Sequence, residues 1–242
     1  SKCTITATTD MGHTTKRGCD DVQAKPARRS RRHGRFVGLA YLFAAILFAS
    51  SASHADMIDT SGLKPWEVCG LCHGIDGISR MQKFPKLAGQ DQAYLEKQLH
   101  DFRAQKRHND GGQMAAIVTE IKEDEIPDIA AHFSSSAPPK PIETETAEID
   151  LSRARILFES GDSGTGIPAC KGCNLPSHRG EIAGPRITAQ HPDYLAKQLR
   201  DFRTGTRSND PTGTMPGITS KLTEREIDAL AAYIAALPRE QG

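Results

Sequence analysis

Apolar side chains recur at helical spacing in two segments that lie one hundred residues apart. Each segment carries two leucines and one phenylalanine at positions i, i+4 and i+7, which places them on one face of an α-helix. These residues are Leu95, Leu99, Phe102 and their counterparts Leu195, Leu199, Phe202. Asp91 is expected to cap the first helix, and Pro192 fits the first turn of the second. We interpret both stripes as the inner faces of core helices.

Two further segments share this period. Residues 151–160 predict a short helix, and residues 223–237 predict a longer one with Ile227, Leu230 and Ile234 on one face. No part of the chain shows the strict alternation of apolar and polar residues that a half-buried strand requires. The pattern therefore predicts an all-α fold.

The sequence also contains an internal repeat. Residues 89–110 and 189–210 are identical at 12 of 22 aligned positions. The identical residues are Gln90, Tyr94, Leu95, Lys97, Gln98, Leu99, Asp101, Phe102, Arg103, Arg107, Asn109 and Asp110, each repeated one hundred positions later. Shared helix composition does not explain so many identities. We therefore predict two tandem copies of one domain, related by internal duplication.

Composition divides the chain around this repeat. The segment at 134–148, SSSAPPKPIETETAE, has the proline, serine and glutamate content of an extended linker. We predict a leader at residues 1–55, a first domain at 56–137, a linker at 138–148 and a second domain at 149–242.

The leader has the order of a secretory signal peptide. Five arginines between positions 28 and 35 precede an apolar run at 37–49, and small residues follow up to Ala55. Cleavage is expected before Asp56, which would place the mature protein in the periplasm. An uncleaved membrane anchor is the less favoured alternative, because the apolar run has 13 residues and about 20 are needed to cross a bilayer.

Removal of the leader changes the charge of the protein. It leaves 22 basic and 27 acidic residues, a formal net charge of −5, with no basic stripe. This mildly acidic chain does not indicate nucleic-acid binding. Aromatic residues make up only 5% of the sequence, which is little for two compact cores, and a porphyrin in each core would supply the missing apolar bulk.

One short motif carries the chemistry. Cys69, Cys72 and His73 form C-x-x-C-H, the attachment signal of c-type haem. Two thiols on one helical turn can form thioethers with one edge of a porphyrin, and the following imidazole can bind the iron. The alternatives are a redox-active thiol pair and half of a zinc site. They are less favoured, because the chain shows no strands and the first copy has no second C-x-x-C.

A low-spin haem needs a sixth ligand, and a methionine thioether raises the reduction potential. Of Met57, Met81 and Met114, the last is favoured, since it lies 41 residues beyond His73 and the chain can return there across the haem. Met215 occupies the equivalent segment of the second copy.

Matching prolines precede the repeated helices. The carbonyl group near Pro85 is a candidate acceptor for the Nδ1–H of His73, which would orient the ring. A plain loop proline is equally compatible with the sequence, here and at Pro185.

Residues 60–240 resemble the two-domain dihaem cytochromes c of bacterial electron transfer, the cytochrome c4 group. The resemblance is carried by Cys69–His73, Pro85, Tyr94–Asp110, Met114, Pro185, Tyr194–Asp210 and Met215, and residues 167–170 resemble the second attachment segment of that group. It implies an electron carrier, not an enzyme, with two covalent haem c groups and His/Met ligation. It also implies a periplasmic protein and a redox partner such as a respiratory complex or terminal oxidase. The resemblance is compatible with association of the protein with the membrane face.

The second copy departs from this pattern. It reads Cys170-Lys-Gly-Cys173-Asn174, and Asn174 precedes Met215 by the same 41 residues that separate His73 from Met114. A carboxamide oxygen is a poor replacement for imidazole on iron.

Three outcomes follow for the second copy. Haem attaches through both cysteines with one open iron position, His178 replaces the missing ligand, or the cysteines form a disulfide without haem. We favour attachment, because the methionine and the proline are both present. An open iron site would give the alternative function, a haem enzyme or small-ligand sensor fed with electrons by the first domain. A haem-free docking domain is the third possibility.

The remaining histidines are interpreted as structural. His100, His108, His132 and His191 are expected in polar surface positions of helices and loops. Tyr233 takes the place of His132 in the second copy, which favours a packing role for this histidine over iron ligation.

Overall fold

The computed structural model describes residues 62–143, 150–175 and 184–239. The chain divides into two units, Ser1–Ala55 and Asp56–Gly242, and all described residues belong to the second unit. The predicted leader, the end of the predicted linker and the candidate ligand His178 therefore lie outside the described residues.

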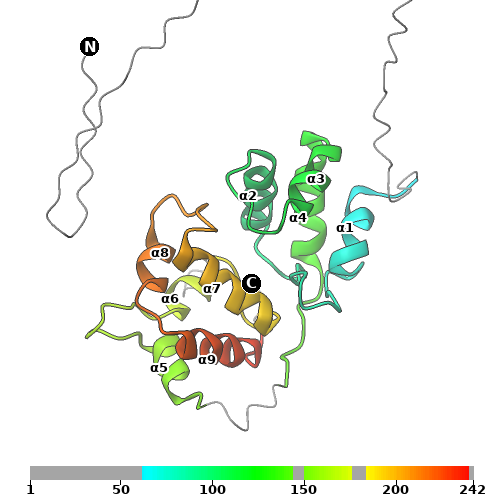
Figure 1. The fold of residues 1–242 in the computed structure, drawn as a ribbon. Coiled ribbons are helices and arrows are strands. Elements are labelled where there is room, and N and C mark those ends of the chain that lie inside the picture. The colour runs from blue at the N-terminus through cyan, green and yellow to red at the C-terminus, as the bar shows by residue number, and fades with distance from the viewer. Residues whose placement is uncertain (1–61, 144–149, 176–183, 240–242) are drawn as a thin grey trace, which may run out of the picture. The chain divides into compact units, whose positions relative to one another are not determined.

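Within residues 62–143, four α-helices and one 3₁₀-helix form the first domain (Figure 1). They are α1 (Pro65–His73), α2 (Gln92–Arg103), α3 (Gln113–Glu120), η1 (Glu123–Glu125) and α4 (Ile126–Ser135). Helix α2 packs along α4 and also contacts α3. The predicted apolar stripe of α2 faces inward, where it joins Val118, Ile129 and Phe133 in one buried cluster.

Within residues 150–175 and 184–239, five α-helices form the second domain (Figure 1). They are α5 (Ser152–Glu159), α6 (Lys171–Asn174), α7 (Pro192–Thr204), α8 (Thr214–Thr219) and α9 (Glu224–Ala235). Helix α9 packs against both α5 and α7, and it contributes the predicted face of Ile227, Leu230 and Ile234 to the buried cluster.

The predicted all-α fold is confirmed. The described residues contain no strand, and their only β-type pairing is an isolated bridge between Asp162 and Ile167. In the same part of the chain, every helix is too short or too polar to pass through a lipid bilayer.

The helix starts follow the local chemistry of the sequence. The Asp91 carboxylate accepts the Tyr94 N–H at 2.8 Å and so caps α2 as predicted. Pro192 occupies the first turn of α7, where its missing N–H costs no hydrogen bond. Thr223 and Glu226 form a reciprocal capping box at the start of α9.

The predicted linker begins in contact with both domains. Pro138 lies against Gly89, where a Cβ would approach the proline ring to 3.1 Å. Further on, the Ile142 N–H donates to the carbonyl oxygen of Ala235, at the end of α9, at 2.9 Å. The described start of the linker is therefore held to the protein by packing and a backbone hydrogen bond.

The two domains are joined by hydrogen bonds that occur in reciprocal pairs. Arg107 donates from Nη2 to Tyr194 Oη at 2.9 Å, and Arg207 donates from Nη2 to Tyr94 Oη at 3.1 Å. A second pair links glutamine amides to backbone carbonyls, Gln90 to Arg186 and Gln190 to Lys86, both at 2.9 Å. The residues that contribute side chains to these pairs are identical in the two copies of the repeat: Gln90 and Gln190, Tyr94 and Tyr194, and Arg107 and Arg207.

Candidate functional site

Helix α1 carries the whole C-x-x-C-H motif of the first domain. Pro65 occupies the first turn of the helix, which ends directly after His73 because Gly74 takes a φ of 82°. A Cβ at Gly74 would lie 2.7 Å from the Ile78 carbonyl oxygen, so glycine is required for this turn. Cys69 is buried and Cys72 is exposed one turn later. The two thiols therefore share one helix with the histidine that follows them.

His73 is held in one orientation. Its Nδ1 lies 2.8 Å from the carbonyl oxygen of Pro85, which decides between the two interpretations of this proline that the sequence left open. Its ring contacts Phe84 edge-on, with centroids 6.0 Å apart. Burial lowers the pKa of His73 despite this hydrogen bond, which favours the neutral imidazole. With Nδ1 occupied, Nε2 is the nitrogen that can bind an iron.

The pKa values of two of the thiols argue against a reactive thiolate pair. Burial raises the pKa of Cys69 to about 11, and it raises that of Cys170 to about 11 as well. A redox-active thiol pair instead depends on a lowered pKa. Among the described residues, no three His, Cys, Asp or Glu side chains gather at one place as zinc ligands would.

Both candidate methionines occupy the second position of a short helix. Met114 lies on α3 and packs against the apolar cluster that contains Cys69, and Met215 lies on α8. The Asp110 carboxylate accepts the N–H of Met114, and Asp210 accepts that of Met215 at 2.6 Å. The recurrence of Asp110 in the repeat was the sequence signal for this role, which sequence analysis did not assign.

The second domain lacks an imidazole at the equivalent position. The Asn174 carboxamide donates from Nδ2 to the Cys170 carbonyl oxygen at 2.8 Å, so the side chain folds back along its own helical turn. Cys170 and Cys173 fit covalent attachment of a haem, whereas Asn174 does not fit the place of the axial histidine. Among the described residues of the second domain, the carbonyl–imidazole pair of the first domain has no counterpart, although Pro185 is present.

The expectation that His191 lies at the polar surface is wrong. His191 is buried, with Nε2 3.0 Å from the carbonyl oxygen of Ser79 in the other domain. Burial and the nearby Lys86 lower the pKa of this histidine. The residue is covered by the opposite domain, which the pattern of a single helix does not reveal.

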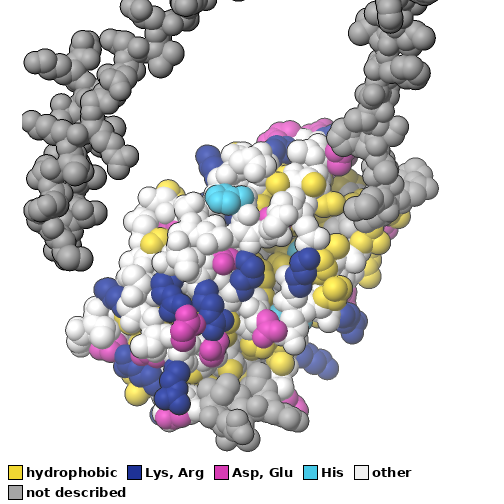
Figure 2. All heavy atoms as spheres, viewed as in Figure 1, with side chains coloured by type: hydrophobic (Ala, Val, Ile, Leu, Met, Phe, Trp, Pro, Cys, Tyr) yellow, Lys and Arg dark blue, Asp and Glu magenta, His cyan; other side chains and the backbone are white. Residues whose placement is uncertain are grey.

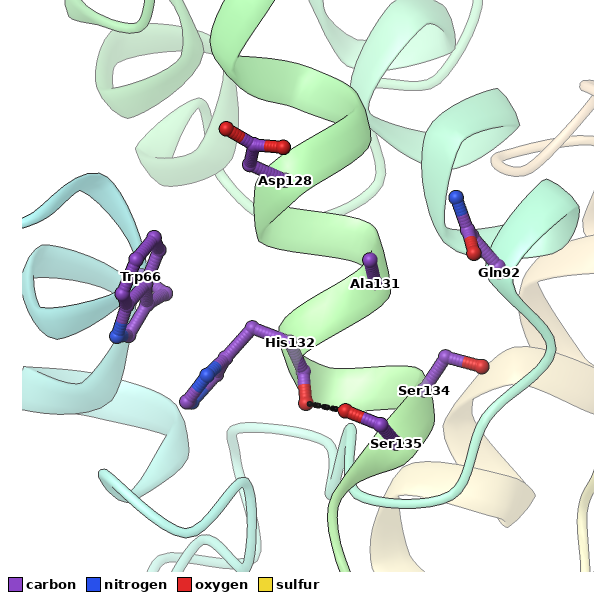
Figure 3. Close-up of a pocket in the computed structure, with 7 residues that line it drawn as sticks. All are labelled: Trp66, Gln92, Asp128, Ala131, His132, Ser134 and Ser135. Atoms are coloured by element: carbon purple, nitrogen blue, oxygen red, sulfur yellow. Dashed lines mark hydrogen bonds between the residues drawn. The ribbon is translucent and has the colours of Figure 1, made fainter.

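His132 packs as predicted. Its ring stacks on Trp66 with centroids 5.1 Å apart and an interplanar angle of 16°, and Figure 3 shows the two rings facing each other between α1 and α4. They border a surface pocket that contains none of the predicted haem ligands. Its other lining residues are Gln92, Asp128, Ala131, Ser134 and Ser135.

An apolar patch, consisting of Leu71, Ile75 and Met81, borders the attachment motif. These side chains are 55%, 60% and 56% exposed, and Figure 2 shows hydrophobic side chains gathered on the side of the first domain where α1 lies. By contrast, basic and acidic side chains interleave over α7 and α9 (Figure 2), where Arg200 pairs with Glu224. The sequence did not indicate the patch, because its residues follow no helical stripe.

Comparisons with known proteins agree with this arrangement. The family model "Cytochrome c" matches residues 62–137. Cytochrome c4 of Pseudomonas aeruginosa is 41% identical over 189 residues, covering 76% of this chain and 91% of that protein. A thiosulfate dehydrogenase electron acceptor of Stutzerimonas stutzeri is 31% identical over 204 residues, covering 82% and 94%.

A solved structure shows the same fold. Reduced recombinant cytochrome c4 from Pseudomonas stutzeri superposes with a TM-score of 0.62 and 38% identity, covering 70% of this chain and 93% of that chain. Since these matches extend over both domains, the chain belongs to the cytochrome c4 family and is a c-type cytochrome that carries electrons on covalently bound haem.

Proposed function

We propose that the first domain is a His/Met electron carrier of an exported, periplasmic protein. Cys69 and Cys72 would hold the haem through thioethers, with His73 and Met114 as the axial ligands. The observation that carries this proposal is the buried His73 ring, whose Nδ1 lies at hydrogen-bond distance from the Pro85 carbonyl oxygen. When bound, haem iron supplies one-electron chemistry by changing between its two oxidation states.

The protein's own residues keep this chemistry to electron transfer. The Pro85 carbonyl fixes the His73 ring, so the imidazole would keep its position when a bound iron changed its oxidation state. As an iron ligand, the soft Met114 sulfur would favour the reduced state and so raise the potential. Burial of His73 and of the cluster around Cys69 excludes water from this side. Two fixed protein ligands would keep the coordination nearly constant and the reorganisation energy small.

Electrons would leave through the side of the first domain that carries the apolar patch. Leu71 directly precedes the exposed Cys72 in the chain, and the exposed Ile75 and Met81 follow it within ten residues. Such a patch suits short-lived docking with a redox protein. We propose partners such as a respiratory complex or terminal oxidase, and the relative that is a thiosulfate dehydrogenase electron acceptor supports a redox enzyme as a donor.

The second domain supports an alternative function. We infer that Cys170 and Cys173 attach a haem with Met215 as a ligand, and that the opposite iron position stays open. The support is the Asn174 carboxamide, which is hydrogen bonded to its own helix. An open position allows small molecules to bind, so this domain could act as a ligand sensor or haem enzyme that receives electrons from the first domain.

The number of attached haems tests directly whether the second domain carries one. The intact mass of the mature protein is expected to exceed that of the polypeptide by two haem groups, because each domain contains a C-x-x-C cysteine pair. The C170S/C173S double variant should lose one haem mass and keep the low-spin spectrum of the first domain. A wild-type mass with a single haem would contradict attachment in the second domain and leave the first-domain proposal intact.

A further inference from the structure

The loop that precedes Met114 is bound by the second domain. The Lys197 ammonium group on α7 donates to the Asn109 carbonyl oxygen at 2.6 Å. The Asn109 side chain donates from Nδ2 to Asp201 Oδ2 at 2.6 Å and to Gln198 Oε1 at 3.0 Å. Both the backbone and the side chain of this one loop residue are therefore held by the opposite domain.

The same arrangement occurs in the other direction. Lys97 on α2 donates to the Asn209 carbonyl oxygen at 3.0 Å. Asn209 Nδ2 donates to Asp101 Oδ2 at 2.7 Å and to Gln98 Oε1 at 3.0 Å. The same set of contacts therefore occurs twice, once in each direction across the interface, which indicates that these contacts are a regular feature of it.

An arginine strengthens each contact from within its own loop. Arg107 donates to Gln98 of its own domain at 2.8 Å and to Tyr194 of the second domain at 2.9 Å. Its guanidinium group lies 4.6 Å from the centroid of the Phe102 ring. Arg107 and Asn109 are both buried, and buried hydrogen bonds to charged groups are costly to break.

A short path connects this contact to the candidate ligand. Asp110 follows Asn109 directly, and its carboxylate accepts the N–H of Met114. Between them, Gly111 and Gly112 have φ angles of 76° and 85°, and nothing lies within 4 Å of their Cβ positions. Gly111 and Gly112 add no side-chain packing to this stretch. Asn109 and Asp110 therefore hold the loop that leads to Met114, while the apolar cluster of the first domain packs against the Met114 side chain.

We propose that docking of the two domains positions the axial methionine of each: α7 of the second domain holds the loop of Met114, and α2 of the first domain holds the loop of Met215. Lys197 and Asn109 are thus positioning residues for the first iron. This inference rests on the proposed ligation by His73 and Met114. Its consequence is that the strength of the iron–methionine bond in one domain depends on residues of the other.

The test uses the full mature holoprotein and cyanide as a probe. Cyanide displaces a methionine from iron(III), and the displacement is followed by loss of the weak far-red absorption band that an iron(III)–methionine bond gives. In the Lys197→Leu variant, this displacement should be about tenfold faster, since a hydrogen bond to a charged group is lost. Lys197→Arg keeps a cationic donor and should restore a rate near that of the wild type.

The repeat provides a matched control. Lys97→Leu removes the corresponding contact at Asn209, which holds the loop of the other methionine, so it should leave the cyanide rate of the first haem unchanged. Equal acceleration in both leucine variants, or a wild-type rate in Lys197→Leu, would overturn the proposal. A wild-type protein without the far-red band would instead overturn the His/Met ligation on which the proposal rests.

Discussion

The Asn174→His variant is expected to lose the carbon monoxide binding of the second haem. The wild-type reduced protein should bind about one carbon monoxide per chain, because the proposed second haem would have an open iron position. Histidine at position 174 would fill it, since this position stands in the same spacing to Met215 as His73 does to Met114. Neighbouring Gly184 has no side chain to block the larger ring. The carbon monoxide difference spectrum measures the effect.

Asn174→Gln is the matched control for this prediction. It keeps a carboxamide at the position and should bind carbon monoxide like the wild type. The interpretation fails if the wild type binds no carbon monoxide, which would mean either that another group fills the iron position or that the second domain carries no haem. It also fails if the histidine variant, with two haems attached, binds as much carbon monoxide as the wild type does.

Met114→Ala should have the largest effect on the first haem. Loss of the thioether removes the ligand that favours iron(II), so the midpoint potential of this haem should fall by on the order of 0.1 V. The far-red iron–methionine band should disappear at the same time. A spectroelectrochemical titration of the purified protein records both changes.

Met81→Ala provides the comparison for this variant. Met81 belongs to the apolar patch and is 56% exposed, so its loss should leave the potential and the far-red band unchanged. If Met81→Ala abolished the band and Met114→Ala kept it, the ligand assignment would be reversed. If both variants kept the band, neither methionine would be the ligand of the first iron.

The sequence by itself determined the local features of this protein. The stripe of α2, the cap at Asp91 and the first-turn Pro192 all agree with the structure. Helical periodicity and capping depend on residues within about one or two turns of each other. The attachment motif is equally local, because its three reactive residues share one helix.

Only the tertiary structure decided what the repeated polar residues do. The identities at Tyr94, Arg107 and Asn109 indicated duplication, yet their positions say nothing about the surface they face. Arg107 meets Tyr194 across a separation of 87 residues, and His191 meets Ser79 across 112. A polar side chain normally indicates a surface that is exposed to solvent. Here the other domain covers that surface.

The orientation of the Asn174 side chain is a second feature that the sequence did not decide. The sequence showed that the histidine is missing, and it left open where the carboxamide would go. In the structure the side chain satisfies its hydrogen bond within its own helical turn, at the Cys170 carbonyl oxygen. Which of several available partners a polar side chain takes depends on the surrounding packing, because the free-energy differences between hydrogen bonds are small.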